Sequence, residues 1–219
     1  MVFTWYASAY WFCFGYNKQF NCNQKIFEGI AIYFMKIILG IAGEIASGKG
    51  TLAKYIKEKK GGNIHRFSTA LRDVARRMHL EESRENLQKI STVFRENFND
   101  NLLSEVIYHD AQADEHLIIV IDGVRRMADI EKLRSLPDFH LVYIETEMEN
   151  RYKRIIKRKE NSDDATKTFA DFKLDNQREA ERQIKDLKKY ADFVINNDGG
   201  FSELYQQVDK IIKDLGAGK

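Results

Sequence analysis

Short apolar runs alternate with longer amphipathic stretches along the chain from residue 35 onward. Five apolar runs predict strands, over residues 36–42, 65–68, 117–121, 139–145 and 192–196. Runs such as IILGIA and LIIVI are apolar at successive positions, which is typical of strands buried on both faces. Apolar residues at a spacing of about 3.6 predict helices over residues 51–59, 70–78, 84–111, 127–133, 147–159, 169–190 and 201–215. This alternation predicts an α/β fold, a five-stranded parallel sheet with helices on both faces.

The first 34 residues differ in composition from the rest of the chain. Aromatic residues crowd into positions 5–16, and only Lys18, Lys25 and Glu28 carry charge. A signal peptide needs a basic region before its apolar run, and a spanning helix needs about 20 apolar residues, and this segment has neither. We expect an extension over residues 1–34 and a catalytic domain over residues 35–219. An over-called start codon ahead of Met35, an arm that binds a partner or a membrane surface, and an ordered hairpin are the open alternatives for the extension.

Composition limits the partners of the domain. The chain has 35 Lys and Arg against 33 Asp and Glu, a net charge of +2, so no global field draws it to nucleic acid or to an anionic membrane. A single Pro and 13 Gly in 219 residues exclude collagen-like and Pro-rich disordered classes. The two cysteines, Cys13 and Cys22, form no CxxC pair and support neither a disulfide framework nor a zinc site. We expect a cytoplasmic monomer or homodimer that acts on a small molecule.

A glycine-rich loop follows the first strand of the domain and runs directly into a helix. Residues 43–51 read GEIASGKGT and contain the pattern G-x-x-x-x-G-K. Glycines let the backbone curl so that its amides converge on phosphate oxygens, the helix N-terminus adds a positive dipole, and Lys49 reaches the β- and γ-phosphates. The loop therefore predicts a nucleoside triphosphate site. Its expected ligands are Gly43, Ala46, Ser47, Gly48, Lys49, Gly50 and Thr51.

The loop carries a family resemblance. Its ending GKGT resembles adenylate kinases, and Ile45 with Ser47 resembles the GIGSGK loop of dephospho-CoA kinases. The resemblance implies a P-loop NTPase fold with a small lid, ATP as phosphoryl donor, and Mg²⁺. Two residues depart from the pattern. Ala46 stands where both families usually have Gly, and we expect it to be tolerated with a negative φ. Gly50 replaces the Ser or Thr that would hold Mg²⁺ directly, so we expect the ion to be held largely through water.

Two segments at the carboxyl ends of predicted strands are suited to the phosphate of an acceptor. Residues 67–72, FSTALR, resemble the acceptor entry S-T-G-D-x-L-R of adenylate kinases without its Gly and Asp. Residues 122–126, DGVRR, resemble the D-G-x-x-R of adenylate kinases and the D-G-V-R of dephospho-CoA-kinase-like proteins. The resemblance implies acceptor ligands at Ser68, Thr69, Arg72, Arg125 and Arg126, of which we favour Arg125 over Arg126. Asp122 would lie near the metal and its waters, with a turn or helix-cap role as the alternative.

A helical insertion over about residues 69–112 separates the second and third strands, where nucleotide kinases carry their acceptor-binding lobe. Gln88 and Arg95 are candidate acceptor contacts in it, and solvated helix surface is the favoured alternative. After the fourth strand, residues 154–158, RIIKR, resemble the R-L-x-x-R that precedes the lid of dephospho-CoA kinases. The resemblance implies that Arg154 and Arg158 neutralise the transferred group, and that a short lid over about residues 158–170 excludes water. A generic basic helix is the alternative.

These features predict an enzyme, an ATP-dependent kinase of a small phosphorylated acceptor. Its expected catalytic residues are Lys49, Asp122, Arg125, Arg154 and Arg158. A nucleoside or deoxynucleoside monophosphate stands ahead of dephospho-CoA, because the D-x-D of dephospho-CoA kinases after the second strand is absent. A nucleotide-binding switch is the alternative from another class, but the N-K-x-D motif of GTPases is absent and a switch has no second phosphate to hold. The acceptor and the choice between ATP and GTP stay open.

Overall fold

The computed structural model describes residues 24–27, 30–33, 36–158, 168–177 and 179–216. The backbone divides into two compact units, Met1–Phe34 and Met35–Lys219. In the first unit, β1 (Gln24–Phe27) and β2 (Ile30–Tyr33) pair antiparallel, with Gln24 opposite Tyr33. An ordered hairpin stays one of the alternatives for the extension.

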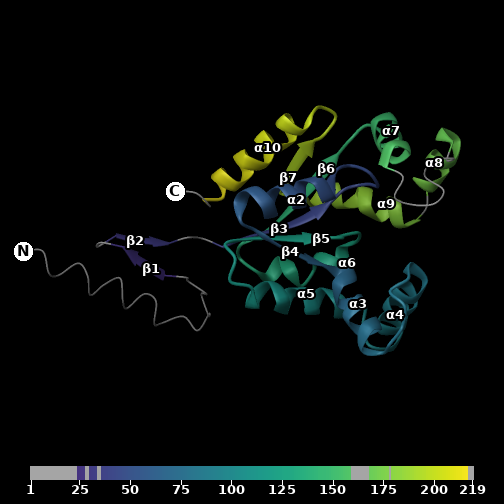
Figure 1. The fold of residues 1–219 in the computed structure, drawn as a ribbon, viewed down its shortest axis with the longest axis horizontal. Helices are drawn as coiled ribbons and strands as arrows, with labels where there is room; N and C mark the ends of the chain where they lie inside the picture. Colours follow the sequence, from purple (N-terminus) through teal and green to yellow (C-terminus); the bar gives the residue numbers. More distant parts are fainter. Residues whose placement is uncertain (1–23, 28–29, 34–35, 159–167, 178, 217–219) are drawn as a thin grey trace, which may run out of the picture. The chain divides into compact units, whose positions relative to one another are not determined.

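The larger unit is built around a sheet of five parallel strands, as the sequence predicts (Figure 1). They are β3 (Ile37–Ala42), β4 (Asn63–Arg66), β5 (Ile118–Asp122), β6 (Phe139–Glu145) and β7 (Phe193–Asn196). The strand order is β4-β5-β3-β6-β7, so β3 lies at the centre. In the pairing register, Ile41 lies opposite Asp122 of β5 and Val142 of β6. The loop that follows β3 therefore starts in the middle of the carboxyl edge of the sheet.

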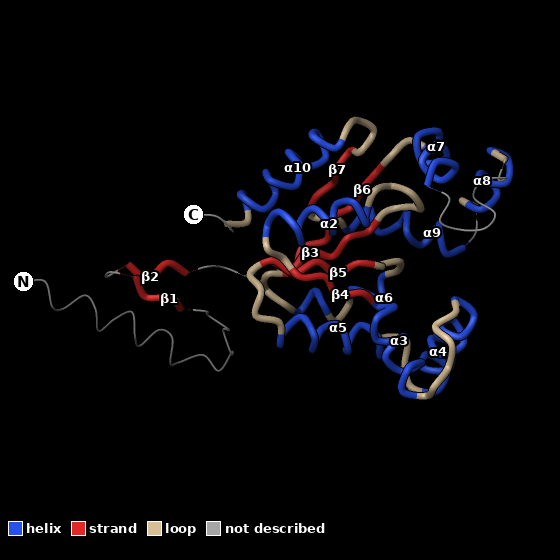
Figure 2. Tube along the Cα trace, viewed as in Figure 1, coloured by secondary structure: helices blue, strands red, loops and turns tan. Residues whose placement is uncertain are grey.

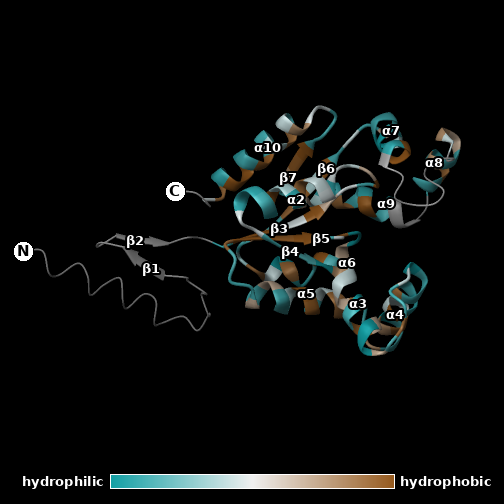
Figure 3. Ribbon diagram, in the orientation of Figure 1, coloured by the Kyte–Doolittle hydropathy of each residue, from teal (hydrophilic) through white to brown (hydrophobic). Residues whose placement is uncertain are grey.

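Helices cover both faces of this sheet, which Figure 2 shows as a central layer of strands between helices. On one face, Ile37, Leu39 and Ile41 of β3 pack in one cluster with residues of α2 (Lys49–Lys60) and α10 (Phe201–Asp214). On the other face, Ile38 and Ala42 pack in a second cluster with residues of α5 (Leu102–Ala113). Because neighbouring residues of β3 are buried in opposite clusters, the whole run is apolar. The apolar strands form the brown centre of the molecule in Figure 3.

The remaining helical elements gather around the loops of the sheet. They are α3 (Phe67–Arg77), α4 (Arg84–Asn97), α6 (Met127–Ile130), α7 (Met148–Arg158), α8 (Phe169–Asp175) and α9 (Glu179–Asp186), with the 3-10 turns η1 (Leu133–Ser135) and η2 (Leu187–Tyr190). None of the helices described here has the length and apolar character that a membrane crossing requires.

Several predicted boundaries are wrong. The second strand ends at Arg66, and Ser68 and Thr69 lie in the first turn of α3, because Phe67 and Leu71 bury one helical face in the core. The helix predicted over residues 84–111 is two helices, because the polar turn formers in residues 98–101, FNDN, interrupt it. The stretches 127–133 and 169–190 are likewise divided into shorter helical pieces. Each error joined or shifted elements without changing the order of strands and helices.

Candidate active site

The glycine-rich loop between β3 and α2 is held in a shape that only small residues allow. Gly43 has a φ of 150° and Gly48, the N-cap of α2, has a φ of 106°. A Cβ on Gly43 would lie 2.5 Å from the carbonyl oxygen of Ile144, and one on Gly48 would lie 2.2 Å from the side-chain nitrogen of Asn197. Both positions therefore require glycine on account of conformation and of space. The first amides of α2, which have no helical partners, open toward this loop.

Ala46 contradicts the expectation of a negative φ. Its φ is 61°, in the left-handed region that usually takes glycine. This conformation costs a residue with a Cβ about 1–2 kcal/mol. Backbone strain of this kind concentrates at loops that clamp ligands. The loop keeps the curl expected of a phosphate cradle even where its sequence lacks the usual glycine.

Lys49 and Ser47 are tied to the loop in different ways. The ammonium group of Lys49 donates to the carbonyl oxygen of Gly43 and, at 2.8 Å, to that of Glu44, so the side chain curls back over the loop. The hydroxyl of Ser47 is buried and has no hydrogen-bond partner among the described residues. A buried hydroxyl without a partner is costly, and a phosphate oxygen would satisfy it. The loop thus fits a phosphate ligand by its backbone and by this orphaned hydroxyl.

Residues just after the carboxyl ends of β6 and β7 hold the loop by hydrogen bonds to its backbone. The carbonyl oxygen of Ser47 accepts hydrogen bonds from Asn197 Nδ2 at 2.7 Å, Thr146 Oγ1 at 3.1 Å and Arg154 Nη1 at 3.4 Å. Burial lowers the pKa of Arg154, partly offset by the negative charge of Asp198. The predicted residue Arg154 therefore lies directly against the loop. The side chain of Arg158 and residues 159–167, most of the predicted lid, lie outside the described residues.

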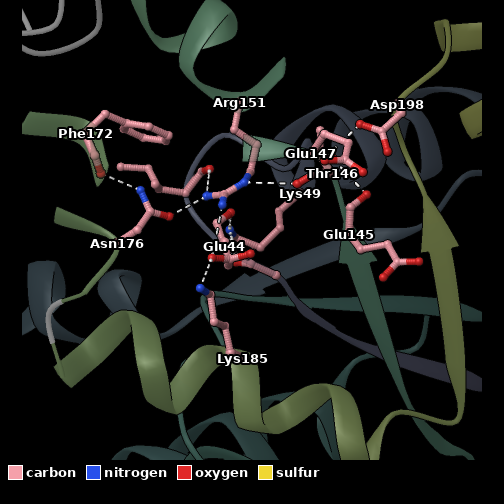
Figure 4. Close-up of polar contacts among 12 residues, drawn as sticks. Glu44, Lys49, Glu145, Thr146, Glu147, Arg151, Phe172, Asn176, Lys185 and Asp198 are labelled. Atoms are coloured by element: carbon pink, nitrogen blue, oxygen red, sulfur yellow. Dashed lines mark hydrogen bonds and ion pairs between the residues drawn. The ribbon is translucent and has the colours of Figure 1, made fainter. Parts of the chain in front are cut away.

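A network of polar side chains around Glu44 joins α7, α8 and α9 to the loop. The sequence did not predict this network. Figure 4 shows the carboxylate of Glu44 between Arg151 of α7 and Lys185 of α9. Arg151 Nη2 lies 3.1 Å and Lys185 Nζ 3.4 Å from Glu44 Oε1. Arg151 Nη1 also donates to Oδ1 of Asn176, at the end of α8, at 2.7 Å. Arg151 is not among the predicted site residues, and no local pattern in the sequence indicates its partners.

Asp122 could supply one carboxylate to a Mg²⁺ ion whose other ligands are waters and substrate phosphates. It ends β5 beside Ile41, and its Oδ2 accepts a hydrogen bond from Arg66 Nε at 3.0 Å. In the part of the chain that the structure describes, no three His, Cys, Asp or Glu side chains lie close enough to hold a metal ion. One carboxylate beside a phosphate loop still fits Mg²⁺, which binds proteins through one or two carboxylates, waters and substrate phosphates. Arg66 was not among the predicted site residues.

Two arginines predicted as acceptor ligands, Arg125 and Arg126, follow β5, and the charges of both act on Arg95 of α4, a candidate contact for which solvated surface was favoured. Arg126 pairs with Asp129 at 3.2 Å and with Asp100 at 3.6 Å. Arg125 is exposed, and its side chain has no hydrogen bond or ion pair with the residues described. Burial lowers the pKa of Arg95, the positive charges of Arg126 and Arg125 lower it further, and Asp129 and Asp100 partly offset this. Its Nε is buried and has no hydrogen-bond partner in the described structure. The helical insertion thus places one arginine within electrostatic range of the two that follow β5.

The other predicted acceptor residues are arranged differently. Arg72 donates to Ser68 Oγ at 2.8 Å and lies 3.5 Å from Glu82, so it is engaged within and beside its own helix. Thr69 and Gln88 are exposed. No contact in the described structure joins these residues to the three arginines. They stay predictions, with solvated helix surface as their alternative.

Thr51, the last residue of the loop motif, also lines a cavity of about 570 Å³ between α2 and α10. Tyr55 and Tyr205 stack in this cavity with ring centroids 3.9 Å apart, and Phe201 lies parallel to Tyr205 at 6.2 Å. The phosphate loop therefore borders an aromatic surface on its α10 side.

Comparison with known proteins identifies the fold independently. Residues 40–173 match the family described as AAA domain. A UPF0200/UPF0201 protein of Archaeoglobus fulgidus is 29% identical over 185 residues, which cover 83% of this chain and 56% of that protein. A UPF0200 protein of Pyrococcus furiosus is 26% identical over 188 residues, 84% of this chain and all of that protein. The chain thus spans little more than half the length of the first of these relatives.

Solved structures with the same architecture include kinases. A dephospho-CoA kinase from Campylobacter jejuni superposes with a TM-score of 0.55 and 19% identity over 84% of this chain and 99% of that one. A shikimate kinase from Bacteroides thetaiotaomicron superposes with a TM-score of 0.56 and 14% identity over 82% of this chain and 98% of that one. At these identities the likeness shows the fold, which is that of P-loop kinases.

Proposed function

This chain belongs to the AAA domain family, and from that premise we propose that it is an ATP-dependent phosphotransferase acting on a small phosphorylated acceptor. The acceptor that fits best is a nucleoside or deoxynucleoside monophosphate. Lys49 and the loop amides would hold the β- and γ-phosphates of ATP, and Asp122 would hold Mg²⁺ through water. Arg154, which lies against the loop, would face the transferred group.

The observation that carries the proposal is the arginine group Arg95, Arg125 and Arg126. The buried Nε of Arg95 has no hydrogen-bond partner in the described structure, which is unusual for a buried donor, and the guanidinium of Arg125 is exposed to solvent. Bidentate binding of a phosphate dianion would use the exposed guanidinium and could satisfy the buried nitrogen. Because β5 neighbours β3 in the sheet, the loop that carries Arg125 and Arg126 lies beside the loop that would hold ATP. Two adjacent phosphate sites are what transfer between a nucleotide and a phosphorylated acceptor requires.

Dephospho-CoA is the second candidate acceptor, supported by the likeness of fold to a dephospho-CoA kinase. The missing D-x-D motif weighs against it, because α3 begins at Phe67 with no carboxylate at the end of β4. A slow nucleotide-hydrolysing switch is the candidate from another class. A switch binds no phosphorylated acceptor and so does not need the arginine group. Substitutions in that group therefore distinguish a switch from a kinase.

A panel of nucleoside monophosphates, deoxynucleoside monophosphates and dephospho-CoA, assayed for ADP release from ATP, tests the proposal. We expect one class of acceptor to stimulate ADP release well above the background hydrolysis of ATP. Arg125→Ala should lower kcat/KM for that acceptor by one to two orders of magnitude, since it removes a charge-assisted contact of about 1.5–3 kcal/mol. Its affinity for ATP, measured by calorimetry, should hardly change.

Arg77→Ala is the matched control, because Arg77 is an exposed arginine of α3 at the end of the helix. It should leave both acceptor kinetics and ATP affinity unchanged. A tenfold loss of ATP affinity in Arg125→Ala with unchanged acceptor kinetics would contradict the assignment of the two sites. If no acceptor in the panel stimulates ADP release, the switch becomes the better reading.

A further inference from the structure

Glu44 places a carboxylate within the phosphate loop, one residue after Gly43. Its side chain is 14% exposed, and its own carbonyl oxygen accepts a hydrogen bond from Lys49 at 2.8 Å. A carboxylate so close to a bound triphosphate repels it unless cations neutralise the carboxylate. In the described structure the cations that do so are Arg151 and Lys185, both on Oε1.

The two cations differ in how firmly they are held. The side chain of Arg151 is 2% exposed. Besides Glu44 it donates to the carbonyl oxygens of Thr146 and Ile45 and to Asn176 Oδ1, at 3.1, 3.4 and 2.7 Å. The side chain of Lys185 is 48% exposed, and Glu44 is its only ion-pair partner among the described residues. A flexible four-carbon stem lets a lysine ammonium change partners at little cost, whereas the fixed guanidinium of Arg151 stays in place.

We propose that Lys185 is a second lysine for the phosphates of the nucleotide, and that it exchanges Glu44 for a phosphate oxygen when the nucleotide binds. The inference rests on the proposed nucleotide site of the loop and extends it to α9. Lys185 and Lys49 each bond to Glu44, one at the carboxylate and one at the carbonyl, so their ammonium groups already converge on one residue (Figure 4). A triphosphate carries several negative oxygens and attracts Lys185 more strongly than one carboxylate does. Arg151 remains on Glu44 and keeps the carboxylate neutralised after the exchange.

The exchange makes opposite predictions for the two partners. Lys185→Ala removes a charge-assisted contact to phosphate, so it should weaken ATP binding about tenfold. Glu44→Gln removes both the competitor for Lys185 and a negative charge beside the phosphates, so it should tighten ATP binding several-fold. The measurement is calorimetric titration of the full chain with ATP, in the presence and absence of Mg²⁺, at fixed ionic strength.

The double variant separates binding from a merely structural ion pair. If Lys185 contacts phosphate, adding Lys185→Ala to Glu44→Gln still costs about tenfold in ATP affinity. If Lys185 acts only by holding Glu44, its loss has no effect once Glu44 is neutral, and that result would overturn the proposal. Lys185→Arg should restore most of the affinity, because it returns the charge. Lys189→Ala, which removes an exposed lysine paired with Asp186, is the control and should leave ATP affinity unchanged.

The experiments distinguish failure of the Lys185 exchange from failure of the proposed kinase activity. Wild-type protein that binds ATP but phosphorylates no acceptor refutes the kinase, while the titrations of the Lys185 variants still decide the exchange. Folded wild-type protein that binds no ATP refutes both. Unchanged ATP affinity in Lys185→Ala overturns the exchange and leaves the kinase in place.

Discussion

Ser47 and Arg95 carry the side-chain donors that are buried without partners in the described structure. Leaving a buried donor unsatisfied costs about 1–3 kcal/mol, more when it is charged. One of these donors lies in the phosphate loop and the other in the arginine group expected to hold the acceptor. The sequence predicted the place of Ser47, because the loop motif fixes it. For Arg95 it favoured solvated surface, because only the packing of α4 brings that residue within electrostatic range of Arg125 and Arg126.

Lys49→Ala should remove nearly all phosphoryl transfer. The change deletes the charge expected to stabilise the β- and γ-phosphates, while its hydrogen bonds to the carbonyl oxygens of Gly43 and Glu44 are local to the loop. Initial rates with the best acceptor measure the loss of phosphoryl transfer, and a thermal melt checks that the fold is retained. A rate within about tenfold of wild type, a loss of under 1.4 kcal/mol in transition-state stabilisation, would refute the assignment of the loop.

Ala46→Gly should stabilise the protein by up to about 1 kcal/mol. It relieves the left-handed strain of about 1–2 kcal/mol and adds back about 0.4–1 kcal/mol of chain entropy in the unfolded state. A melting temperature 2–4 °C higher is the expected size for a chain of this length. His79→Gly is a matched control, since His79 has a φ of 56° and lies outside the loop. A lower melting temperature in Ala46→Gly alone would show that the Cβ of Ala46 makes contacts that outweigh the strain.

At the scale of elements, the amino-terminal side of the sheet is tied together by one carboxylate. Asp114, the C-cap of α5, accepts hydrogen bonds from Asn63 Nδ2 at 2.7 Å and from the backbone N–H of His116 at 2.9 Å. It also pairs with the rings of His65 and His116 at 2.7 and 2.6 Å. Burial alone would raise the pKa of Asp114, but these hydrogen bonds together hold it well below its usual range. The group joins β4, α5 and the start of β5.

The stability of the protein should therefore fall at acid pH in a way that depends on Asp114. Because the pKa of Asp114 is lower in the folded state than the value of about 3.9 in the unfolded chain, its contribution is complete above about pH 5 and is lost as pH falls further. Asp114→Asn should lower the free energy of unfolding by about 2 kcal/mol at pH 7. Urea titrations of both proteins from pH 7 to pH 3 should show this difference shrinking below pH 4. A difference that stays constant across the range would contradict the assignment.

Elements were predicted well where periodicity alone defines them. The fourth strand, over residues 139–145, matches β6 at both ends, because its apolar run is bounded by Asp138 and by the polar residues that follow Glu145. The ends of α8 and α9 were not predicted, because the apolar spacing continues through both helices and the break depends on their packing. The ion pair of Glu44 and Lys185 was not predicted, because it too depends on tertiary packing. They lie about 140 residues apart in the sequence, and no local pattern indicates that they meet.

On the scale of the whole molecule, residues 35–219 contain all five strands of the parallel sheet and both of its apolar clusters. Alternation of apolar runs and helices was enough to predict this sheet. The order of its strands was not predicted, since periodicity carries no information on which strands are neighbours. The same limit applies to the site, where the motifs named the loops but not the cross-links between them.

A chain that begins at Met35 should fold and turn over like the full chain. The sheet starts with β3 at Ile37, and the contacts divide the backbone between Phe34 and Met35. Thermal melts and steady-state rates of the two proteins, measured side by side, check this. A large drop in the melting temperature of the shorter chain would show that the aromatic extension stabilises the domain.

The central position of β3 bears on how the protein is synthesised. The strand leaves the ribosome first among the five, yet its neighbours β5 and β6 begin only at Ile118 and Phe139. A strand apolar at every position must then wait without a partner while the 75 residues between Ala42 and Ile118 are made, and such strands are prone to aggregate or to need chaperones. The residues that brace the phosphate loop, Thr146 and Asn197, emerge later still. The phosphate loop therefore gains its bracing contacts only once Asn197 has been made, and shorter nascent chains should lack them.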